Sequence, residues 1–205
     1  MTRLKKKTIY LLRHGRTQYN EARILQGGTV DSPLTEQGIC QAKGNAMVLK
    51  ELLAPVPYEQ IAYYSSPMGR ARQTTALLLE GINRPLQAIY DARLGEAKMG
   101  SWEGKNMDEL KKTVPEYTTH PDEWLFFSPD GESYQDVVAR CEQWIKEGEE
   151  IPQDHIVVVC HGLLSRVLRG CLLQLPYEQV LGLPIPQEGF FVIKNGETRF
   201  VGEGK

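Results

Sequence analysis

Residues 9–15 read IYLLRHG, and residues 156–162 read IVVVCHG. Each is a short apolar run of the kind that forms a buried strand, and each ends in a His-Gly pair. Four histidines and 19 glycines among 205 residues would give about 0.4 such pairs by chance. Glycine lets the backbone turn sharply and approach a ligand closely. We therefore expect both histidines to face a ligand; the alternative is two loop histidines that face solvent.

The rest of the chain alternates strands with helices. Further strands are expected at residues 61–64, 86–90, 189–193 and 198–201, and the last two flank Asn195-Gly196, a typical hairpin turn. Helices are expected at residues 34–53, 67–79, 132–145 and 163–173, with Pro67 in the first turn of the second. This order predicts an α/β fold, a three-layer αβα sandwich with a mostly parallel central sheet and an antiparallel edge strand.

Composition places the chain among ordinary globular proteins. It is 41% hydrophobic and 24% charged, with a net charge of −2, so neither intrinsic disorder nor a surface that coats nucleic acid or anionic membrane is expected. The length favours one domain, residues 1–205. Residues 100–131 are rich in aromatic residues and proline and show no strand pattern, so we expect a small cap insertion over a site.

Cysteine usage and the start of the chain bear on location. The chain has no CxxC pair, and we expect its four cysteines to be buried free thiols rather than metal ligands (Cys40, Cys141, Cys160 and Cys171). The basic residues 1–7 precede an apolar stretch that is too short for a signal peptide. A cytoplasmic location is therefore expected.

Cationic side chains accompany the same strand ends. Arg13 precedes His14, and Arg70 follows the strand at residues 61–64 in the first turn of the next helix. Because ligands bind beyond the carboxyl ends of parallel strands, these residues and His161 should face one crevice. Arginine forks match phosphate oxygens, and helix N-termini add backbone donors. A phosphate ligand is predicted. Arg16 also lies near His14 and is counted with these cationic groups; the alternative is that Arg16 is a solvent-exposed charge on a helix.

An ordered series of motifs resembles the histidine phosphatase superfamily, also called phosphoglycerate mutase-like. The series runs LRHGRT at 12–17, Asn20, Gln26-Gly27, DSPLT at 31–35, SSP at 65–67 with Arg70, LGE at 94–96, WEG at 102–104, GES at 131–133 and VCHG at 159–162. Arg16 departs from the pattern, since many relatives carry Glu there. This departure adds positive charge at the edge of the expected pocket.

The resemblance implies a phosphohistidine mechanism that needs no metal and no cofactor. His14 is then the nucleophile, and the phosphoryl oxygens are held by cationic and polar groups (Arg13, Arg70 and His161, completed by Asn20, Gln26, Gly27 and Gly162). Glu96 is the implied general acid, and Glu103 is its rival.

The expected function is hydrolysis of small phosphomonoesters, in the phosphatase branch of the superfamily. The alternative is a cofactor-dependent phosphoglycerate mutase, which the short, apolar insertion disfavours. A non-catalytic phosphoryl-binding module is disfavoured too, because nucleophile, acid and arginines are all in place. The expected partner is a small phosphorylated metabolite, with no nucleic acid and no membrane. The hydrophobic hairpin edge leaves room for a homodimer.

Overall fold

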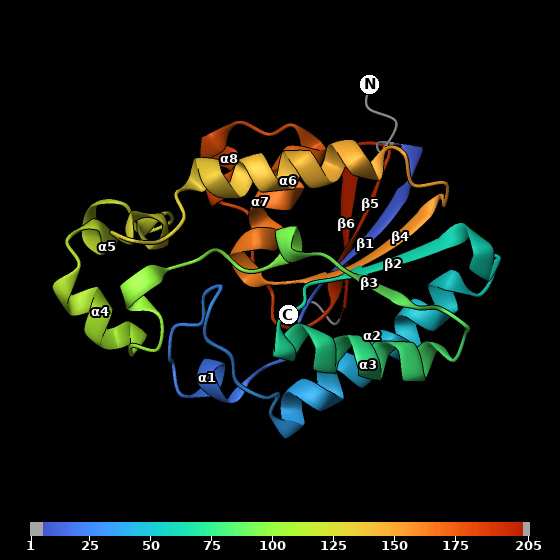
Figure 1. Cartoon of the computed structure of the whole chain (residues 1–205), viewed down its shortest axis with the longest axis horizontal. Coiled ribbons are helices and arrows are strands. Elements are labelled where there is room, and N and C mark those ends of the chain that lie inside the picture. Colours follow the sequence, from blue (N-terminus) through green and yellow to red (C-terminus); the bar gives the residue numbers. More distant parts are fainter. Residues whose placement is uncertain (1–5, 203–205) are drawn as a thin grey trace.

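A six-stranded sheet forms the centre of the computed structural model, which describes residues 6–202 (Figure 1). The strand order is β3-β2-β4-β1-β5-β6. The bounds are β1 Thr8–Arg13, β2 Ile61–Ser65, β3 Ala88–Tyr90, β4 His155–Cys160, β5 Phe190–Lys194 and β6 Glu197–Val201. The prediction for the basic start falls in part on residues 1–5, which lie outside the described residues.

The carboxyl ends of β1, β4 and β2 lie side by side at one edge of the sheet. β1 pairs with β4 in parallel and places Arg13 opposite Cys160, while β2 pairs with the other side of β4 and places Ser65 opposite Val159. The residues that follow these strands therefore leave the sheet side by side. The amide of His14 still donates to the carbonyl of Cys160 at 3.0 Å, and that of Ser66 to Val159 at 2.9 Å.

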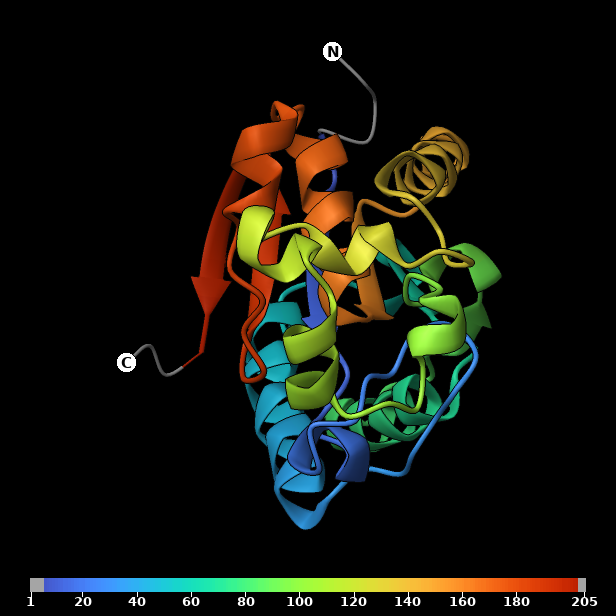
Figure 2. The same cartoon turned by 90° about the vertical axis from the view of Figure 1, so that its left-hand side faces the viewer.

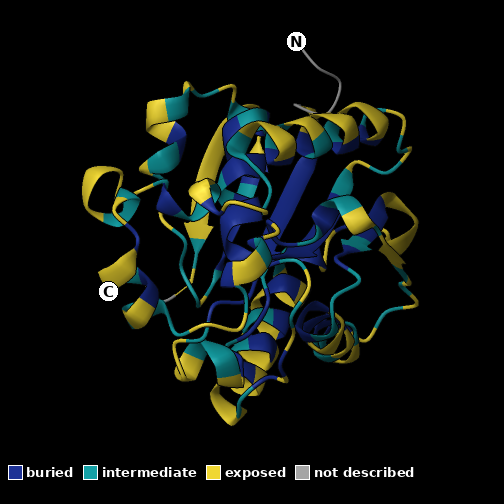
Figure 3. Ribbon diagram, turned by 60° about the vertical axis from the view of Figure 1, so that its left-hand side comes forward, coloured by how far each residue is buried: buried dark blue, intermediate teal, exposed yellow. Residues whose placement is uncertain are grey.

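Helices cover both faces of the sheet (Figures 1 and 3). One face carries α2 Glu36–Leu53 and α3 Gly69–Ile82; the other carries α6 Tyr134–Gly148, α7 Gly162–Leu173 and α8 Tyr177–Leu181. Because successive strand residues point to opposite faces, Val157 belongs to the same buried cluster as Leu49 of α2, and Val158 belongs to the cluster that contains Trp144 of α6. The predicted three-layer αβα sandwich is confirmed.

The edge beyond β1 is an antiparallel hairpin. β5 pairs with β1 and β6 pairs with β5, so two strands rather than one run against the parallel part of the sheet. The turn lies at Asn195 and Gly196, with φ of 54° and 78°. Positive φ at both positions is typical of the tight hairpin turn that Asn-Gly predicts.

All four predicted helices begin one or two residues from the expected position: α7 begins one residue earlier, and α2, α3 and α6 each begin two residues later. Pro67 lies before α3, not inside it, because Met68 is extended (φ −69°, ψ 145°) and forms the N-cap. α6 begins at Tyr134 rather than Glu132, because the Ser133 side chain accepts from the amide of Asp136 and the Asp136 side chain accepts from that of Ser133. Such a capping box fixes the first helical residue.

Residues 100–131, the segment that we call the cap, contain no strand, as predicted. Their elements are η4 Gly100–Trp102, α4 Met107–Thr113, α5 Glu116–Thr119 and η5 Trp124–Phe127. Figure 2 shows α4 and α5 in front of the sheet, near the short helix α1 Gln18–Glu21 that follows β1. The ring of Trp124 lies 5.6 Å from that of Trp102 and 5.5 Å from that of Tyr117, and both tryptophans belong to the buried cluster that lies between the sheet and α6 and α7.

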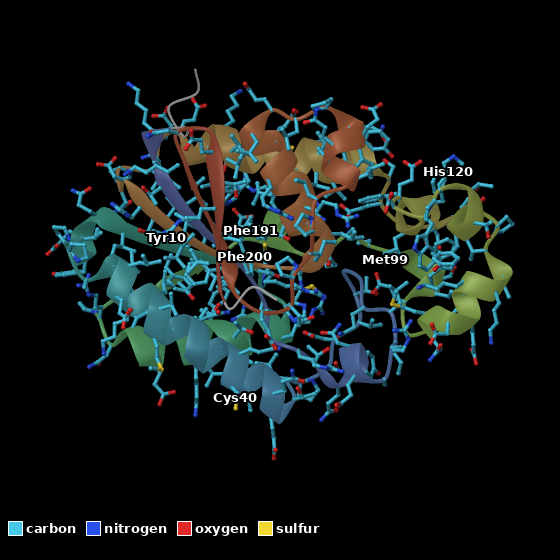
Figure 4. The ribbon with its side chains drawn as sticks, turned by 180° about the vertical axis from the view of Figure 1, so that it is seen from behind. Tyr10, Cys40, Met99, His120, Phe191 and Phe200 are labelled. Atoms are coloured by element: carbon cyan, nitrogen blue, oxygen red, sulfur yellow. The ribbon has the colours of Figure 1, made fainter. Side chains whose placement is uncertain are left out.

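The cysteines are not uniformly buried. Cys141 and Cys160 are buried, as expected, but Cys171 is half-buried and Cys40 is exposed on the outward side of α2 (Figure 4). The apolar pattern misled here because Cys40 follows Ile39, which is itself exposed. Within residues 6–202, no helix has the length and apolar character needed to cross a membrane.

Candidate active site

His14 lies directly after β1 and is only 3% exposed. Its Nδ1 lies 2.8 Å from the carbonyl oxygen of Gly15, and its Nε2 lies 3.2 Å from Nε of Arg70. A carbonyl can only accept and an arginine N–H can only donate, so Nδ1 carries the proton and Nε2 carries a lone pair. Burial, then the charges of Arg13 and Arg70, lower the pKa of His14 well below its usual value. The imidazole is therefore neutral and nucleophilic at Nε2.

His161 stands beside it at the end of β4 and is fully buried. The two imidazole centroids are 5.1 Å apart. Burial, followed by the charges of Arg70 and Arg13, lowers the pKa of His161 well below its usual value. Nε2 of His161 lies 2.7 Å from Oγ of Ser66.

Two buried nitrogens of the site have no hydrogen-bond partner among the described residues: Nδ1 of His161 and Nε of Arg13. Leaving a buried polar group unpaired costs about 1–3 kcal/mol. Burial also lowers the pKa of Arg13, against the opposing charge of Glu96. Arg13 and His161 are close enough for the charge of Arg13 to lower the pKa of His161. Their two unpaired nitrogens could therefore donate to different oxygens of one ligand that carries several acceptor oxygens.

Arg70 is held rigidly in the second position of α3. Its Nη1 donates to the carbonyl of Val30 and to Oδ1 of Asp31, each at 3.1 Å, and its Nη2 donates to the carbonyl of Gly27 at 3.0 Å. Asp31 also accepts from the backbone amide of Arg70 at 3.3 Å and so caps α3. These three contacts to the loop at 27–31 set the direction of the guanidinium, with Nε facing His14 and one hydrogen of Nη2 left for a further acceptor.

Glu96 is bound to the start of α7. Its Oε2 accepts from the amide of Leu163 at 3.1 Å, and its Oε1 accepts from that of Leu164 at 2.9 Å and from that of Ala97 at 3.0 Å. α7 begins directly after His161, so this carboxyl lies at the same helix end as the second histidine. The side chain is buried, and it interacts electrostatically with the guanidinium of Arg13.

Glu103 has a different environment. Its carboxylate accepts five hydrogen bonds, from the amides of Gly28, Thr29, Val30 and Met99 and from the hydroxyl of Thr29. The hydrogen bonds from Thr29, Met99 and Val30 lower the pKa of Glu103, against the effect of burial. Glu103 thus ties the cap base to the loop that holds Arg70.

The remaining sequence-predicted residues lie around this centre. Oδ1 of Asn20 accepts from the amide of Thr17 at 3.1 Å, and Gln26 bonds to the hydroxyls of Thr17 and Ser32. Their carboxamides brace the loop after β1.

The two predicted glycines lie closer to the arginines. Gly27 supplies the carbonyl that holds Arg70. A Cβ at Gly162 would lie 3.0 Å from the side chain of Ile185 and 3.4 Å from the guanidinium carbon of Arg13, so a larger residue would crowd both side chains. Arg16 turns aside from the centre, since its Nη1 donates to Gln37 of α2 at 3.1 Å.

The sequence model described as "Histidine phosphatase superfamily (branch 1)" matches residues 9–203. The chain belongs to this superfamily. "Fructose-2,6-bisphosphatase TIGAR" of Xenopus tropicalis is 33% identical over 145 residues, 66% of this chain and 47% of that protein, so the chain spans about half of that relative's length. "Probable phosphoglycerate mutase GpmB" of Escherichia coli is 32% identical over 191 residues, 91% of this chain and 80% of that protein.

Solved structures agree with the assignment to the superfamily. The mycobacterial glucosyl-3-phosphoglycerate phosphatase in complex with VO3 matches with a TM-score of 0.75 at 27% identity, over 96% of this chain and 98% of that one. The chain is thus similar both to proteins named as phosphatases and to one named as a mutase.

In this histidine phosphatase chain, the structure adds two residues to which sequence reasoning gave no role. Nε2 of Gln187 donates to the carbonyl of His14 at 3.0 Å, and Oγ of Ser66 contacts His161. Gln187 is 173 positions from His14, so no local pattern could have indicated it. Ser66 follows a strand that ends beside β4, and that position is the signal that could have indicated it.

Proposed function

We propose that this protein is a phosphatase that hydrolyses small phosphomonoesters through a phosphohistidine at Nε2 of His14. The observation that carries the proposal is the lone pair at Nε2 of His14 beside two unpaired buried nitrogens, Nε of Arg13 and Nδ1 of His161. A phosphoryl group supplies the electrophile for the first and the acceptor oxygens for the other two.

The reaction divides into two steps. In the first, Nε2 of His14 attacks phosphorus and the bond to the ester oxygen breaks, while a protonated Glu96 gives its proton to the departing alkoxide. In the second, the Glu96 carboxylate takes a proton from water, the water oxygen attacks phosphorus, and the bond to His14 breaks. Inorganic phosphate leaves and both residues return to their starting states. Arg13, Arg70 and His161 stabilise the charge on the phosphoryl oxygens throughout.

Hydrolysis, rather than phosphoryl return to substrate, is supported by the small cap. Residues 100–131 carry four short helices, and the buried positions among them include Trp102, Leu110 and Trp124. The name of the Escherichia coli relative keeps the mutase as the second candidate. A panel of phosphomonoesters, assayed with and without 2,3-bisphosphoglycerate, separates the two. Release of phosphate without 2,3-bisphosphoglycerate supports the phosphatase. Isomerisation of the substrate only when 2,3-bisphosphoglycerate is present would overturn the phosphatase proposal in favour of the mutase.

The proposal includes independence from added metal ions. The charges that meet the phosphoryl group belong to Arg13 and Arg70, and among residues 6–202 no group of three His, Cys, Asp or Glu is arranged to hold a metal ion. Activity is therefore expected to persist in excess chelator. Complete loss in chelator, restored by a divalent ion, would contradict this electrostatic argument. The buried free thiols of Cys141 and Cys160 suit the reducing cytoplasm as the place of reaction.

A further inference from the structure

The hydroxyl of Ser66 makes a short contact to a catalytic group without belonging to the expected set of site residues. Ser66 follows β2 directly, is fully buried, and places Oγ 2.7 Å from Nε2 of His161. The same oxygen also accepts a hydrogen bond from the backbone amide of Met68 at 3.3 Å. Both contacts lie at the strand ends, where β2 and β4 run in parallel.

The direction of the hydrogen bond follows from what each partner can do. A serine hydroxyl has one hydrogen to donate and lone pairs to accept with. The amide of Met68 can only donate, so the hydroxyl hydrogen has one acceptor among these contacts, Nε2 of His161. Pairing this buried hydrogen requires the lone pair of the imidazole on Nε2, so that a neutral His161 carries its proton on Nδ1; the other tautomer would leave the hydroxyl hydrogen without an acceptor among these contacts.

We propose that Ser66 is a positioning residue that fixes the tautomer of His161, so that Nδ1–H is the donor offered to a phosphoryl oxygen. Nδ1 is the buried nitrogen that has no partner among the described residues. In the other tautomer it would present a lone pair to an anion, and a stabilising contact would become a repulsive one. The phosphoryl part of this inference rests on the proposed function; the tautomer itself does not.

The adjacent serine provides a matched control. Ser65 is also fully buried, but its hydroxyl donates to the carbonyl of Ser66 at 3.0 Å and accepts from Thr75 at 2.8 Å. No hydrogen bond joins its side chain to His161 in the described part of the chain. Ser65→Ala and Ser66→Ala therefore remove equally buried hydroxyls, and only the second removes the proposed director of the tautomer.

The tautomer is read by two-bond ¹H–¹⁵N NMR of protein labelled at histidine, with His161→Asn to assign the signals. We expect wild type and Ser65→Ala to show His161 protonated at Nδ1, and Ser66→Ala to show a mixture or the Nε2-protonated form. A wild-type His161 protonated at Nε2 would overturn the proposal, even if Ser66→Ala fails to fold. An unchanged tautomer in folded Ser66→Ala would also overturn it.

Kinetics give the functional readout. Removing one donor from a developing oxyanion costs about 10²–10³-fold in turnover, and a partial loss of the correct tautomer should cost at least about 10-fold in kcat with a smaller change in KM. Inhibition by inorganic phosphate should weaken in parallel in Ser66→Ala and stay unchanged in Ser65→Ala. Equal effects of the two variants would reduce Ser66 to a structural role. If no ester is hydrolysed by any form, the proposed function fails while the NMR result still decides the tautomer.

Discussion

Single side chains decide which of the two glutamates at the site can act as the acid. Glu96 shares the N-terminus of α7 with His161, whereas the oxygens of Glu103 are taken up by five hydrogen bonds to the loop at 28–30 and to Met99. Glu96 accepts three backbone hydrogen bonds of its own, but it does so beside His161, whereas those of Glu103 join the cap base to the loop that holds Arg70. We therefore propose the acid role for Glu96 and a structural role for Glu103.

Glu96→Gln should show selectivity for the leaving group. A general acid matters for a poor leaving group such as an alkoxide and matters little for a nitrophenolate. Phosphorylation by an alkyl phosphate should slow by about 10²-fold or more, and that by a nitrophenyl phosphate much less. The comparison is made on kcat/KM or on the burst phase. Equal slowing for both substrates would remove Glu96 from the acid role.

Glu103→Gln should instead affect stability. The amide that replaces one carboxylate oxygen would confront backbone N–H donors, and losing such hydrogen bonds costs about 1–3 kcal/mol of unfolding free energy. Denaturant unfolding measures the loss, and the leaving-group ratio should match wild type. A variant with wild-type stability and a changed leaving-group ratio would contradict the assignment.

The sequence correctly predicted the proximity of site residues that lie at or directly after strand ends. Arg13, His14 and His161 come directly after or at the end of apolar runs, so their meeting could be predicted from parallel pairing alone. The pairing of Arg70 with Asp31, 39 positions apart, depends on how the loop at 27–31 folds, and nothing local indicates it. The roles assigned to Asn20 and Gln26 stay predictions.

α2 packs against the loop that follows His14 through two glycines, Gly15 and Gly38. A Cβ at Gly15 would collide with the carbonyl of Gly38, and one at Gly38 would collide with the carbonyl of Arg16. The first turn of α2 therefore rests directly on the backbone that follows His14. Neither φ is in the left-handed region, so the demand is for space rather than for conformation.

Gly38→Ala should therefore lower both stability and activity, because the clash is with backbone and pushes α2 away from the loop. Overpacking of this kind costs about 1–3 kcal/mol. Gly44→Ala is the control in the same helix: its Cβ meets open space, and alanine should raise the unfolding free energy by about 0.5–1 kcal/mol. Thermal unfolding and kcat/KM check both. A Gly38→Ala enzyme as stable and active as Gly44→Ala would refute the contact.

Periodicity predicted the long elements and missed the short ones. β1 and β4 are apolar except at their ends (Thr8, Arg13 and His155), and the apolar runs 9–12 and 156–160 located them to within one residue at each end. Helix starts depended on caps: Thr35 caps α2 and Ser133 caps α6, and both helices begin two residues later than predicted. The four- and five-residue helices α1 and α8 are too short to show a helical repeat.

The protein as a whole contains two buried histidines that stay uncharged. In the unfolded chain each has a pKa near 6.5, and folding lowers both. Below about pH 6.5 the unfolded state binds protons that the folded state does not, so the unfolding free energy falls as pH falls, by up to about 1.4 kcal/mol per pH unit for each histidine. Their full contribution is present above that pH.

Denaturant unfolding at pH 7.5 and 5.5 tests this dependence. Wild type should lose more stability over the interval than the double variant His14→Asn/His161→Asn, by up to about 3 kcal/mol. The double variant controls for His155 and the carboxyl groups, which it retains. An equal loss in the two proteins would mean that the histidines are not held neutral by the fold.

The proposed covalent step can be tested by trapping the phosphoenzyme. Rapid mixing with a phosphomonoester, followed by a quench in base, should yield a phosphoenzyme that is stable in base and labile in acid, with phosphate on the peptide that contains His14 and attached at Nε2. His14→Ala should give no phosphoenzyme and should lose turnover by about 10³-fold or more, while its circular dichroism spectrum stays that of the folded protein. Full activity in folded His14→Ala, or phosphate on another residue, would contradict the mechanism.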